Sequence, residues 1–334
     1  LARDGFGQSP TSSTVCTISV WVKRGTNFGS NQVIIYGGDP SGSTAESLRF
    51  GTGDQLQFNQ ASSDYDLKTT QLFRDTHAWY HIVAVLNTGA AESSRAALYV
   101  NGSQVTDFAT ENYPGSSYST NFTANSSSVE HVIGANASGG GASQFFDGYI
   151  AELYFIDGQA LTPTSFGEFD TNGIWRPIDA TGLTFGNNGF YLDFETSGSD
   201  LGDDKSGNSN DLTNTNSATQ TSDSPTKNYA VLSHLTHQTN GSLSKGNTQT
   251  TASSDQGLSF STFPVTTGQK VYIEALCSGA TTTMTGCVKA TSAVVGNPAS
   301  DFDALESADG GAGRLLHVAT GDVFNSDGNT SASN

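Results

Sequence analysis

The sequence predicts an all-β protein, and three observations lead to that prediction. Only 14% of the 334 residues are charged, whereas solvent-exposed helices are rich in Glu, Lys and Arg. The 38 glycines, with abundant Ser, Thr and Asn, favour turns and short strands. Short runs of strand-forming residues, separated by Gly, Asn, Asp and Ser, recur along the chain. The length exceeds the roughly 100–200 residues of one ordinary domain, so we expect two folded units and a connector.

Strand patterns dominate the first 160 residues. Residues 16–23 place Ile18, Val20 and Val22 on one face, which predicts a strand with one buried face. The spacing of the patterns is typical of a β-sandwich. Further strands are expected at residues 32–36, 47–50, 55–59, 79–86, 96–100, 131–133 and 149–156.

Two local signals are specific. Asn101 and Gly102 supply the two positive-φ residues of a type I′ turn, so they predict a β-hairpin. After the last strand of this part, Thr162 and Pro163 predict a short helical turn with a threonine cap and proline at its first position. We expect this turn to end the first sandwich.

The remainder of the chain divides into two parts. Residues 178–225 are rich in Gly, Asn, Ser and Asp, with one apolar strand at 189–194, and we interpret them as a connector. A second β unit is expected over residues 226–334, incomplete at its end. Its strand patterns lie at 229–232, 257–263, 270–276, 286–290 and 314–319.

Four motifs follow one another in residues 1–177. They are ISVWVKR at 18–24, FRDTHAWYHIV at 73–83, LYVNG at 98–102 and FDGYIAEL at 146–153. With these motifs in this order, the first part of the chain resembles laminin-G or concanavalin-A-like jelly rolls. The resemblance implies a jelly-roll β-sandwich over residues 1–177.

Three segments carry a more specific resemblance: WVKR at 21–24, DGYIAELYFIDGQALTP at 147–163 and GIWRP at 173–177. Their sequences resemble virion fibre and appendage proteins of marine tailed bacteriophages. In that family a segment like residues 201–211 follows the jelly roll, and a SPRY-like β domain comes next. VYIE at 271–274 and VFNSDG at 323–328 resemble parts of that domain, which implies a partial SPRY-like domain over residues 226–334.

The charge and hydropathy limit the partners. A net charge of −18 repels nucleic-acid phosphates and anionic lipid. Because no stretch of 18 or more apolar residues occurs, we expect no membrane insertion. The phage resemblance instead implies a place on the virion surface, with other virion proteins and host cell-surface polysaccharide as partners, and a homo-oligomer, a trimer in the case of a fibre.

The sequence offers no catalytic residues that we can assign. Glucanases of this fold need two carboxylates flanking the scissile bond, but Glu152 and Asp157 are five residues apart, on opposite faces of a regular strand. The 6 histidines lack zinc-site spacing, and neither a nucleophile elbow nor a phosphate-binding loop is present. We therefore expect a protein that is not an enzyme.

A candidate calcium loop lies in the connector. Asp203, Asp204, Asn208 and Asp211 supply oxygen ligands among Gly and Ser, as a structural Ca²⁺ site requires. The alternative is a solvated turn whose Asp and Asn side chains cap their own backbone.

Candidate glycan-binding residues follow from the need for an aromatic platform beside hydrogen-bonding side chains on exposed loops. Residues 111–118 offer Asn112, Tyr113 and Tyr118, and residues 63–66 offer Asp64 and Tyr65. The alternative is that these loops form an interface with another subunit.

The three cysteines form no disulfide framework. Cys277 and Cys287 either face each other across a hairpin or are reduced, buried thiols.

Together these features predict a virion appendage that contacts the host surface through weak, repeated glycan binding. Two alternatives remain open. One is a purely structural decoration or joining subunit of the virion. The other is a secreted bacterial adhesin or carbohydrate-binding module, for which we expect a secretion signal in the full gene.

Overall fold

The computed structural model describes residues 1–40, 44–137, 141–236, 241–252, 259–264, 276, 284–287, 314–317 and 323–325. These residues belong to two compact units, Leu1–Tyr229 and Ala230–Asn334. Every regular element among them is a β-strand or a 3₁₀ turn, the longest such turn being η4 (Gly198–Gly202), so the all-β prediction is confirmed. Among these residues no helix is long and apolar enough to cross a membrane.

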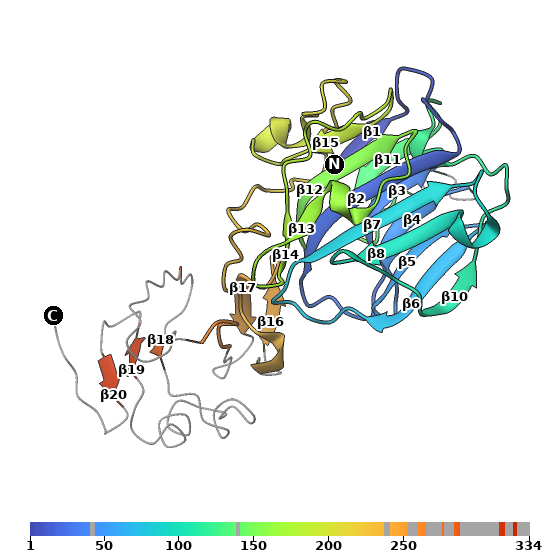
Figure 1. Ribbon diagram of the computed structural model, residues 1–334. Helices are drawn as coiled ribbons and strands as arrows, with labels where there is room; N and C mark the ends of the chain where they lie inside the picture. The colour runs from blue at the N-terminus through green and yellow to red at the C-terminus, as the bar shows by residue number, and fades with distance from the viewer. Residues whose placement is uncertain are drawn as a thin grey trace. The chain divides into compact units, whose positions relative to one another are not determined.

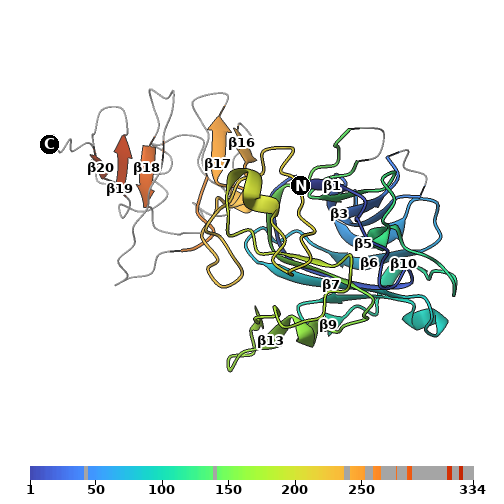
Figure 2. The ribbon, with the colours of Figure 1, turned by 90° about the horizontal axis from the view of Figure 1, so that it is seen from above.

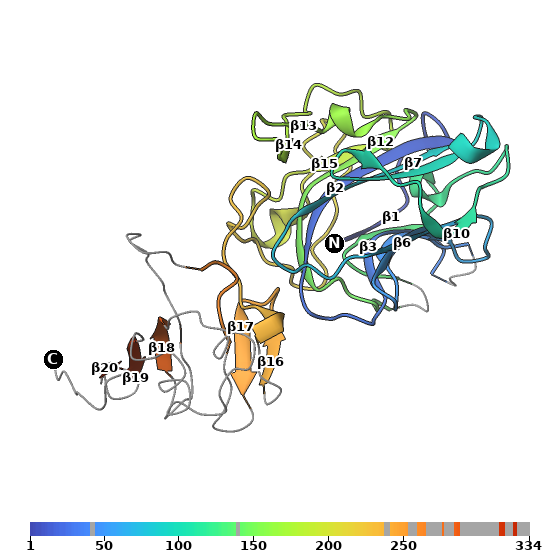
Figure 3. The ribbon, with the colours of Figure 1, turned by 60° about the horizontal axis from the view of Figure 1, so that its bottom comes forward.

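The first unit is a sandwich of two antiparallel sheets (Figures 1 and 3). One sheet has seven strands in the order β1-β11-β3-β4-β5-β6-β10. Their bounds are β1 Ala2–Asp4, β11 Glu130–Ile133, β3 Gln32–Gly38, β4 Glu46–Phe50, β5 Gln55–Gln60, β6 Asp66–Leu72 and β10 Phe108–Asn112.

The other sheet has six strands in the order β15-β12-β2-β7-β8-β9. Its bounds are β15 Phe190–Leu192, β12 Gly148–Asp157, β2 Val15–Arg24, β7 Tyr80–Asn87, β8 Ala96–Val100 and β9 Ser103–Gln104. The strand β15 lies in the segment predicted as a connector, and it pairs with β12, so residues 178–225 contribute to the first unit.

The main core lies between the two sheets and contains the predicted inward face of β2, Ile18, Val20 and Val22. The expectation of only one buried face is wrong, however, because Trp21 and Lys23 on the other face of β2 are buried too. A third layer covers them. It includes the hairpin of β13 (Gly167–Phe169) and β14 (Trp175–Pro177), which lies outside the six-stranded sheet in Figure 2.

A stack of three rings holds that hairpin. His81 lies between Trp21 and Trp175, with ring centroids 4.8 and 5.9 Å away. The Trp175 indole N–H donates to His81 Nδ1 at 2.9 Å, and His81 Nε2 lies 2.8 Å from Ser19 Oγ. An indole N–H only donates, so Nδ1 is the acceptor and the neutral ring carries its proton on Nε2. Burial lowers the pKa of His81 to about 3, which keeps this ring neutral.

Lys23 is held by the end of the first unit. Its Nζ donates to Asp223 Oδ2 at 3.0 Å and to Asn228 Oδ1 at 2.7 Å. It also donates to the Tyr229 carbonyl oxygen at 3.0 Å. The Trp79 indole N–H reaches the second oxygen of Asp223 at 3.0 Å, so residues 223–229 lie across β2 and β7.

Arg24, the next residue, points into the sandwich. Its Nη2 lies 3.2 Å from Asp54 Oδ1, and its Nη1 donates to the Phe73 carbonyl oxygen at 2.5 Å. The guanidinium also lies over the rings of Phe28 and Phe50. Arg24 therefore links β2 to the turn between β4 and β5 in the opposite sheet.

The two local predictions are confirmed in outline. Asn101 and Gly102 have φ values of 48° and 82°, as a type I′ turn between β8 and β9 requires. The 3₁₀ turn η3 spans Pro163–Ser165, but the Thr162 side chain bonds to Thr164 Oγ1 at 2.9 Å instead of capping the turn.

In the two sheets of the sandwich, three strands were not expected from the sequence: β1, β6 and β10. β6 (DLKTTQL) and β10 (FATEN) have no clean alternation of apolar and polar residues. β10 also contains a register shift between Phe108 and Thr110, which breaks the period-2 pattern. A second irregularity lies in β12, where Glu152 has a φ of 48° and the register shifts between Ala151 and Tyr154.

In the second unit the structure describes a hairpin of β16 (Gly241–Ser244) and β17 (Gln249–Ala252). It also describes a sheet of β18 (Met284–Cys287), β19 (Arg314–His317) and β20 (Val323–Asn325). β18 and β19 overlap the strands predicted at 286–290 and 314–319, whereas 229–232 contains only an isolated bridge from Leu232 to Ser261.

Several predictions for this unit lie outside the described residues. They include the strand at 270–275 with the motif at 271–274, residues 326–328 of the second motif, and Cys277. The two alternatives for Cys277 and Cys287, a disulfide across a hairpin or reduced thiols, are therefore not tested by the structure.

We predict that Asp223→Ala lowers the free energy of unfolding by about 3–5 kcal/mol, because it leaves the buried Lys23 ammonium without its carboxylate. Urea unfolding measures the change. The control is Lys205→Ala, which removes an exposed ion pair of 3.4 Å with Asp203 and should cost less than about 1 kcal/mol. Equal losses in the two variants would contradict the assignment. Lys23→Met in the Asp223→Ala background should restore part of the stability.

Candidate functional site

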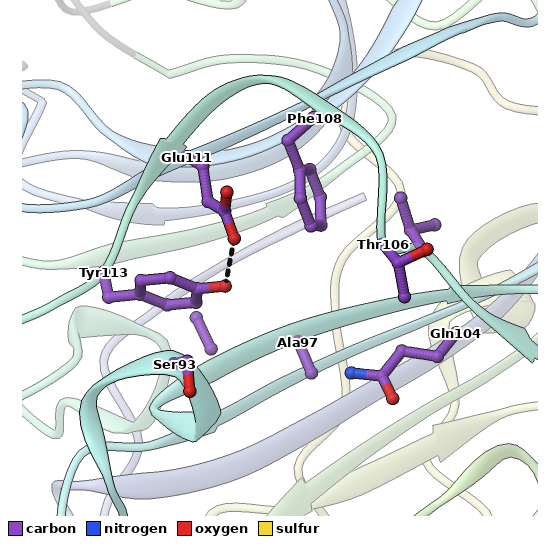
Figure 4. A pocket seen from close by; sticks show the side chains of 9 residues that line it. Ser93, Ala97, Gln104, Thr106, Phe108, Glu111 and Tyr113 are labelled. Atoms are coloured by element: carbon purple, nitrogen blue, oxygen red, sulfur yellow. Dashed lines mark hydrogen bonds between the residues drawn. The ribbon is translucent and has the colours of Figure 1, made fainter.

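A pocket of about 130 Å³ lies where the sandwich ends (Figure 4). β10 is the edge strand of the seven-stranded sheet, and β9 is the edge strand of the six-stranded sheet beside β8. The pocket lies between these two edges. Its lining residues are Ser93, Ala96, Ala97, Gln104, Val105, Thr106, Phe108, Glu111 and Tyr113.

The register shift in β10 brings the aromatic and acidic residues of the pocket together. Phe108 and Glu111 are three residues apart, so a regular strand would place them on opposite faces. The extra residue between Phe108 and Thr110 reverses the alternation, and Glu111 then shares a face with Phe108 and Tyr113. Glu111 lies opposite Leu67, a core residue, so its side chain is directed toward the gap between the sheets.

The opposite wall of the pocket is open because β9 is short. β9 pairs only with Tyr99 and Val100, so it does not extend along β8 as far as Ala96 and Ala97. Alanine side chains fill little of the space left there. Figure 4 shows Ala97 and Gln104 across the pocket from Phe108 and Glu111.

The pocket presents both aromatic rings and exposed polar groups. Tyr113 donates its hydroxyl to Glu111 Oε1 at 2.6 Å (Figure 4). Burial, together with the neighbouring Glu111 carboxylate, raises the pKa of Tyr113 to about 12, so the hydroxyl keeps its proton. Within the described part of the chain, the side chains of Ser93, Gln104 and Thr106 have no hydrogen-bond partner. These groups are therefore available to a ligand.

The segment that carries Tyr113 is fixed on its far side. Arg95 Nη1 donates to the Pro114 carbonyl oxygen at 3.2 Å, and Arg95 Nε donates to the Ala90 carbonyl oxygen at 3.3 Å. Further along, Tyr118 N donates to the Gly115 carbonyl oxygen at 3.1 Å. These bonds hold the backbone that follows Tyr113.

Of the five predicted glycan-binding residues, only Tyr113 lines this pocket. The structure corrects the expectation for Tyr65, whose ring is 0% exposed and packs against Phe58 and Tyr118. Asn112 Nδ2 donates to the Ser63 carbonyl oxygen at 2.9 Å, which joins the two predicted loops. Asp64 is exposed beside that contact.

Tyr118 is a structural residue in this fold, because its hydroxyl donates to Oε1 of the buried Glu46. The second oxygen of Glu46 accepts from Thr120 Oγ1, from Asn121 N at 2.8 Å and from Phe122 N at 3.2 Å. Burial raises the pKa of Glu46 to about 7 in spite of these four donors. Glu46 thereby anchors the chain that leads from the pocket into η2 (Asn121–Thr123).

Four other residues, predicted as calcium ligands, form a loop held by its own backbone. Asp204 Oδ1 accepts from Tyr191 N at 2.9 Å and Ser206 N at 2.8 Å. Its Oδ2 accepts from Ser206 Oγ at 2.8 Å and from Asn210 N at 2.9 Å. These donors occupy both oxygens of Asp204.

The remaining predicted ligands have similar roles. Asp211 Oδ1 accepts from Asp204 N at 2.8 Å, and Asp203 lies 3.4 Å from Lys205 Nζ. Asn208 Nδ2 donates to the carbonyl oxygens of Gly186 and Gly189. Across the residues that the structure describes, no group of three or more His, Cys, Asp or Glu side chains is arranged to hold a metal ion. Calcium binding by Asp203, Asp204, Asn208 and Asp211 stays a prediction.

Ser19 and His81 form a buried pair in which Ser19 Oγ lies 2.8 Å from His81 Nε2. This is the separation found between a catalytic nucleophile and its general base. The pair lacks the chemistry, because Nε2 already carries the proton and cannot take one from serine. His81 Nδ1 accepts from Trp175, whereas a catalytic triad needs it to donate to a carboxylate. Both side chains are also buried, so Ser19 and His81 hold the outer layer in place.

Glu152 and Asp157 likewise have separate structural partners. Glu152 Oε2 accepts from Tyr191 Oη at 2.6 Å, on the outer face of the six-stranded sheet. Asp157 accepts from the backbone N–H groups at 11–12 and from Asn188 N at 3.1 Å. No hydrogen bond joins the two carboxyl groups among the described contacts, and neither lines the pocket.

Comparison with known proteins agrees with this architecture. Residues 6–165 match the family described as the Concanavalin A-like lectin/glucanases superfamily. Together with the two antiparallel sheets, this match defines a concanavalin-A-like domain, so the predicted fold class of the first unit is confirmed. No curated protein matches the chain.

Solved structures with similarity to the chain include the following three. The pentraxin from Limulus polyphemus is 18% identical, with a TM-score of 0.33, over 48% of this chain and 76% of that chain. The CBM40 domain of the Ruminococcus gnavus sialidase, bound to α2,3-sialyllactose, is 14% identical with a TM-score of 0.35, over 49% and 95%. Domains LG4–5 of mouse laminin α1 are 13% identical with a TM-score of 0.30, over 48% and 42%.

The raised pKa of Glu46 predicts a pH-dependent stability. Because its folded-state pKa of about 7 exceeds the ordinary 4.5, the folded protein binds this proton more tightly than the unfolded chain. The resulting stabilisation is complete below about pH 4.5 and is lost as the pH rises through 7. Relative to Glu46→Gln, the wild type should therefore lose up to roughly 3 kcal/mol between pH 5 and pH 8.

Urea unfolding of the two proteins across that range provides the measurement. His81 and His131 are buried in both proteins, so their contributions cancel in the difference. A stability difference that does not change with pH would show that Glu46 keeps an ordinary pKa.

The calcium prediction has a direct test in thermal unfolding. If calcium binds the loop of Asp204, a chelator lowers the Tm of the wild type, and Asp204→Ala lowers the Tm without further sensitivity to the chelator. An unchanged wild-type Tm, together with no calcium in elemental analysis, would leave the loop as a turn capped by its own side chains.

Proposed function

We propose that the first unit is a carbohydrate-recognition domain and that the pocket between β8, β9 and β10 is its binding site. The observation that carries this proposal is the meeting of two aromatic rings, Phe108 and Tyr113, with hydrogen-bonding groups that have no partner in the described chain. The C–H face of a sugar packs on such rings, and its hydroxyls bond to amide, hydroxyl and carboxylate groups.

The size of the pocket supports contact with one sugar unit at a time. Its volume of about 130 Å³ is below the roughly 300–1,000 Å³ of sites that enclose a drug-sized ligand. Such a contact is weak for a single copy. Repetition of the domain on one particle turns weak sites into a strong attachment.

The composition of the pocket supports binding without cleavage. Glycoside hydrolysis by the usual acid/base route requires a pair of carboxyl groups across the scissile bond. The pocket lining contains one carboxylate, Glu111, and that group already accepts the Tyr113 hydroxyl.

We propose further that the chain is part of a virion appendage of a tailed bacteriophage and binds host cell-surface polysaccharide. The motifs at 21–24, 147–163 and 173–177 support this assignment through their resemblance to such proteins. The proposal includes a homo-oligomer, a trimer in a fibre, in contact with other virion proteins, and a partial SPRY-like domain over residues 226–334.

A purely structural role in the virion is the second candidate, and one observation favours it. Phe169 and Ile174, beside the turn of the β13–β14 hairpin, are each 58% exposed. Exposed apolar side chains of this kind suit a contact with a neighbouring subunit. A secreted bacterial adhesin would use the same pocket and differs in carrying a secretion signal in its gene.

Binding of the full chain, displayed in many copies, to host cells and their extracted polysaccharide tests the proposal. Tyr113→Ala should weaken binding at least tenfold because it removes a ring and a hydroxyl from the pocket. Tyr229→Ala is the matched control: its side chain is 50% exposed outside the pocket, and only its backbone contacts Lys23.

Saturable binding that both variants retain would place the receptor site elsewhere. No binding by the wild type would favour the structural role. Circular dichroism and the Tm of Tyr113→Ala verify that its loss of binding is not a loss of fold. Tyr118→Ala is unsuited to this test because it removes a donor from the buried Glu46.

A further inference from the structure

The charge of the pocket bears on the class of sugar that it accepts, an inference that rests on the proposed carbohydrate binding. Of the 9 lining residues, Glu111 is the only charged one. Its Oε1 accepts the Tyr113 hydroxyl, and within the described residues its second oxygen has no partner. A ligand in the pocket therefore meets a carboxylate that can still accept a hydrogen bond.

Among the described residues that line the pocket, none has a basic side chain. Lys68 lies opposite Thr110, and directly opposed residues of an antiparallel pair share a face. Successive residues alternate, so Lys68 lies on the face away from Glu111. Arg95 keeps its positive charge, but its Nε and Nη1 donate to the carbonyl oxygens of Ala90 and Pro114, so these donors are not available to a sugar.

The surroundings add negative charge. Glu92 and Asp107 are exposed and adjoin the lining residues Ser93 and Thr106. The whole chain carries a net charge of −18. An acidic sugar that enters the pocket would bring a like charge close to Glu111, and the two charges would repel each other.

We propose that this pocket selects uncharged or amine-bearing sugars and rejects sugars that carry a carboxylate, sulfate or phosphate. A hydroxyl or an ammonium group donates to the free oxygen of Glu111, while Gln104 offers both a donor and an acceptor. The rings of Phe108 and Tyr113 contact the apolar face of the sugar in either case. Glu111 thus determines specificity, and the aromatic residues supply the general affinity.

The test uses sugars that share a ring and differ only in one charged group. Polymers bearing many copies of glucose, glucosamine or glucuronate, and of galactose, galactosamine or galacturonate, are passed over the immobilised full chain at pH 7. In the series that binds, the uronate should bind at least tenfold more weakly than the neutral sugar, and the amine at least as tightly. The difference in affinity between the neutral sugar and the uronate should decrease as salt is added, because salt screens the repulsion.

Two substitutions isolate the carboxylate. Glu111→Gln keeps an acceptor for the Tyr113 hydroxyl and should reduce the discrimination against the uronate, measured as the ratio of the affinities for neutral sugar and uronate, to less than threefold. Glu168→Gln makes the same change at an exposed position of β13 outside the pocket and should leave the discrimination intact.

The outcomes separate this inference from the proposed function. If the wild type binds uronates as tightly as neutral sugars, or if only acidic polysaccharide binds through Tyr113, the selectivity is wrong and carbohydrate binding stands. If Glu111→Gln keeps the full discrimination and aggregates more readily, Glu111 only protects the edge strand from pairing. If neither the sugar polymers nor host polysaccharide bind the wild type, the proposed function itself fails.

Discussion

Two adjacent buried cations at the end of β2 constrain the whole first unit. Lys23 and Arg24 point to opposite faces of the strand, and each has a single aspartate partner far away in the sequence, Asp223 and Asp54. A buried charge without its partner costs several kcal/mol. Conformations in which Lys23 or Arg24 is buried without its aspartate are therefore strongly disfavoured. Arg24 fixes one sheet against the other. Lys23 fixes residues 223–229 on the outer face, and this is why the unit extends to Tyr229 and does not end with the last strand of the sandwich.

The two ends of the sandwich are built differently, and the difference places the pocket. At the β1 and β15 end, later segments add to the edges: Thr213 pairs with Ala2, and Asp204 holds the backbone of Tyr191. At the β9 and β10 end, β9 contains two residues and leaves β8 open. The space between the two sheets is lined by apolar core side chains. At this end it opens to solvent beside polar side chains from edge strands and loops. That combination of apolar wall and polar rim is what carbohydrate recognition needs.

Local chemistry explains which features the sequence predicts and which it does not. The Asn101–Gly102 turn and the alternation in β2 are visible because a few neighbouring residues determine them. β10 is not visible, because its register shift breaks the alternation and its residues are mostly polar. The same limit applies to the tyrosines. Tyr113 and Tyr118 look alike in sequence, and only the fold brings Glu46, 72 residues before Tyr118, under one of them.

Glu111 lies at the edge of the sandwich and is directed between the two sheets. Burial of a carboxylate in the centre of the sandwich would cost several kcal/mol, whereas at the edge the open side of β8 gives Glu111 access to water. An edge strand with an inward charge resists pairing with other chains, so Glu111 protects the free edge at β10. The short β9 that leaves β8 open thus permits both a polar pocket and a protected edge. The pocket is small, so under the proposed function strong attachment requires many copies of the domain to act together.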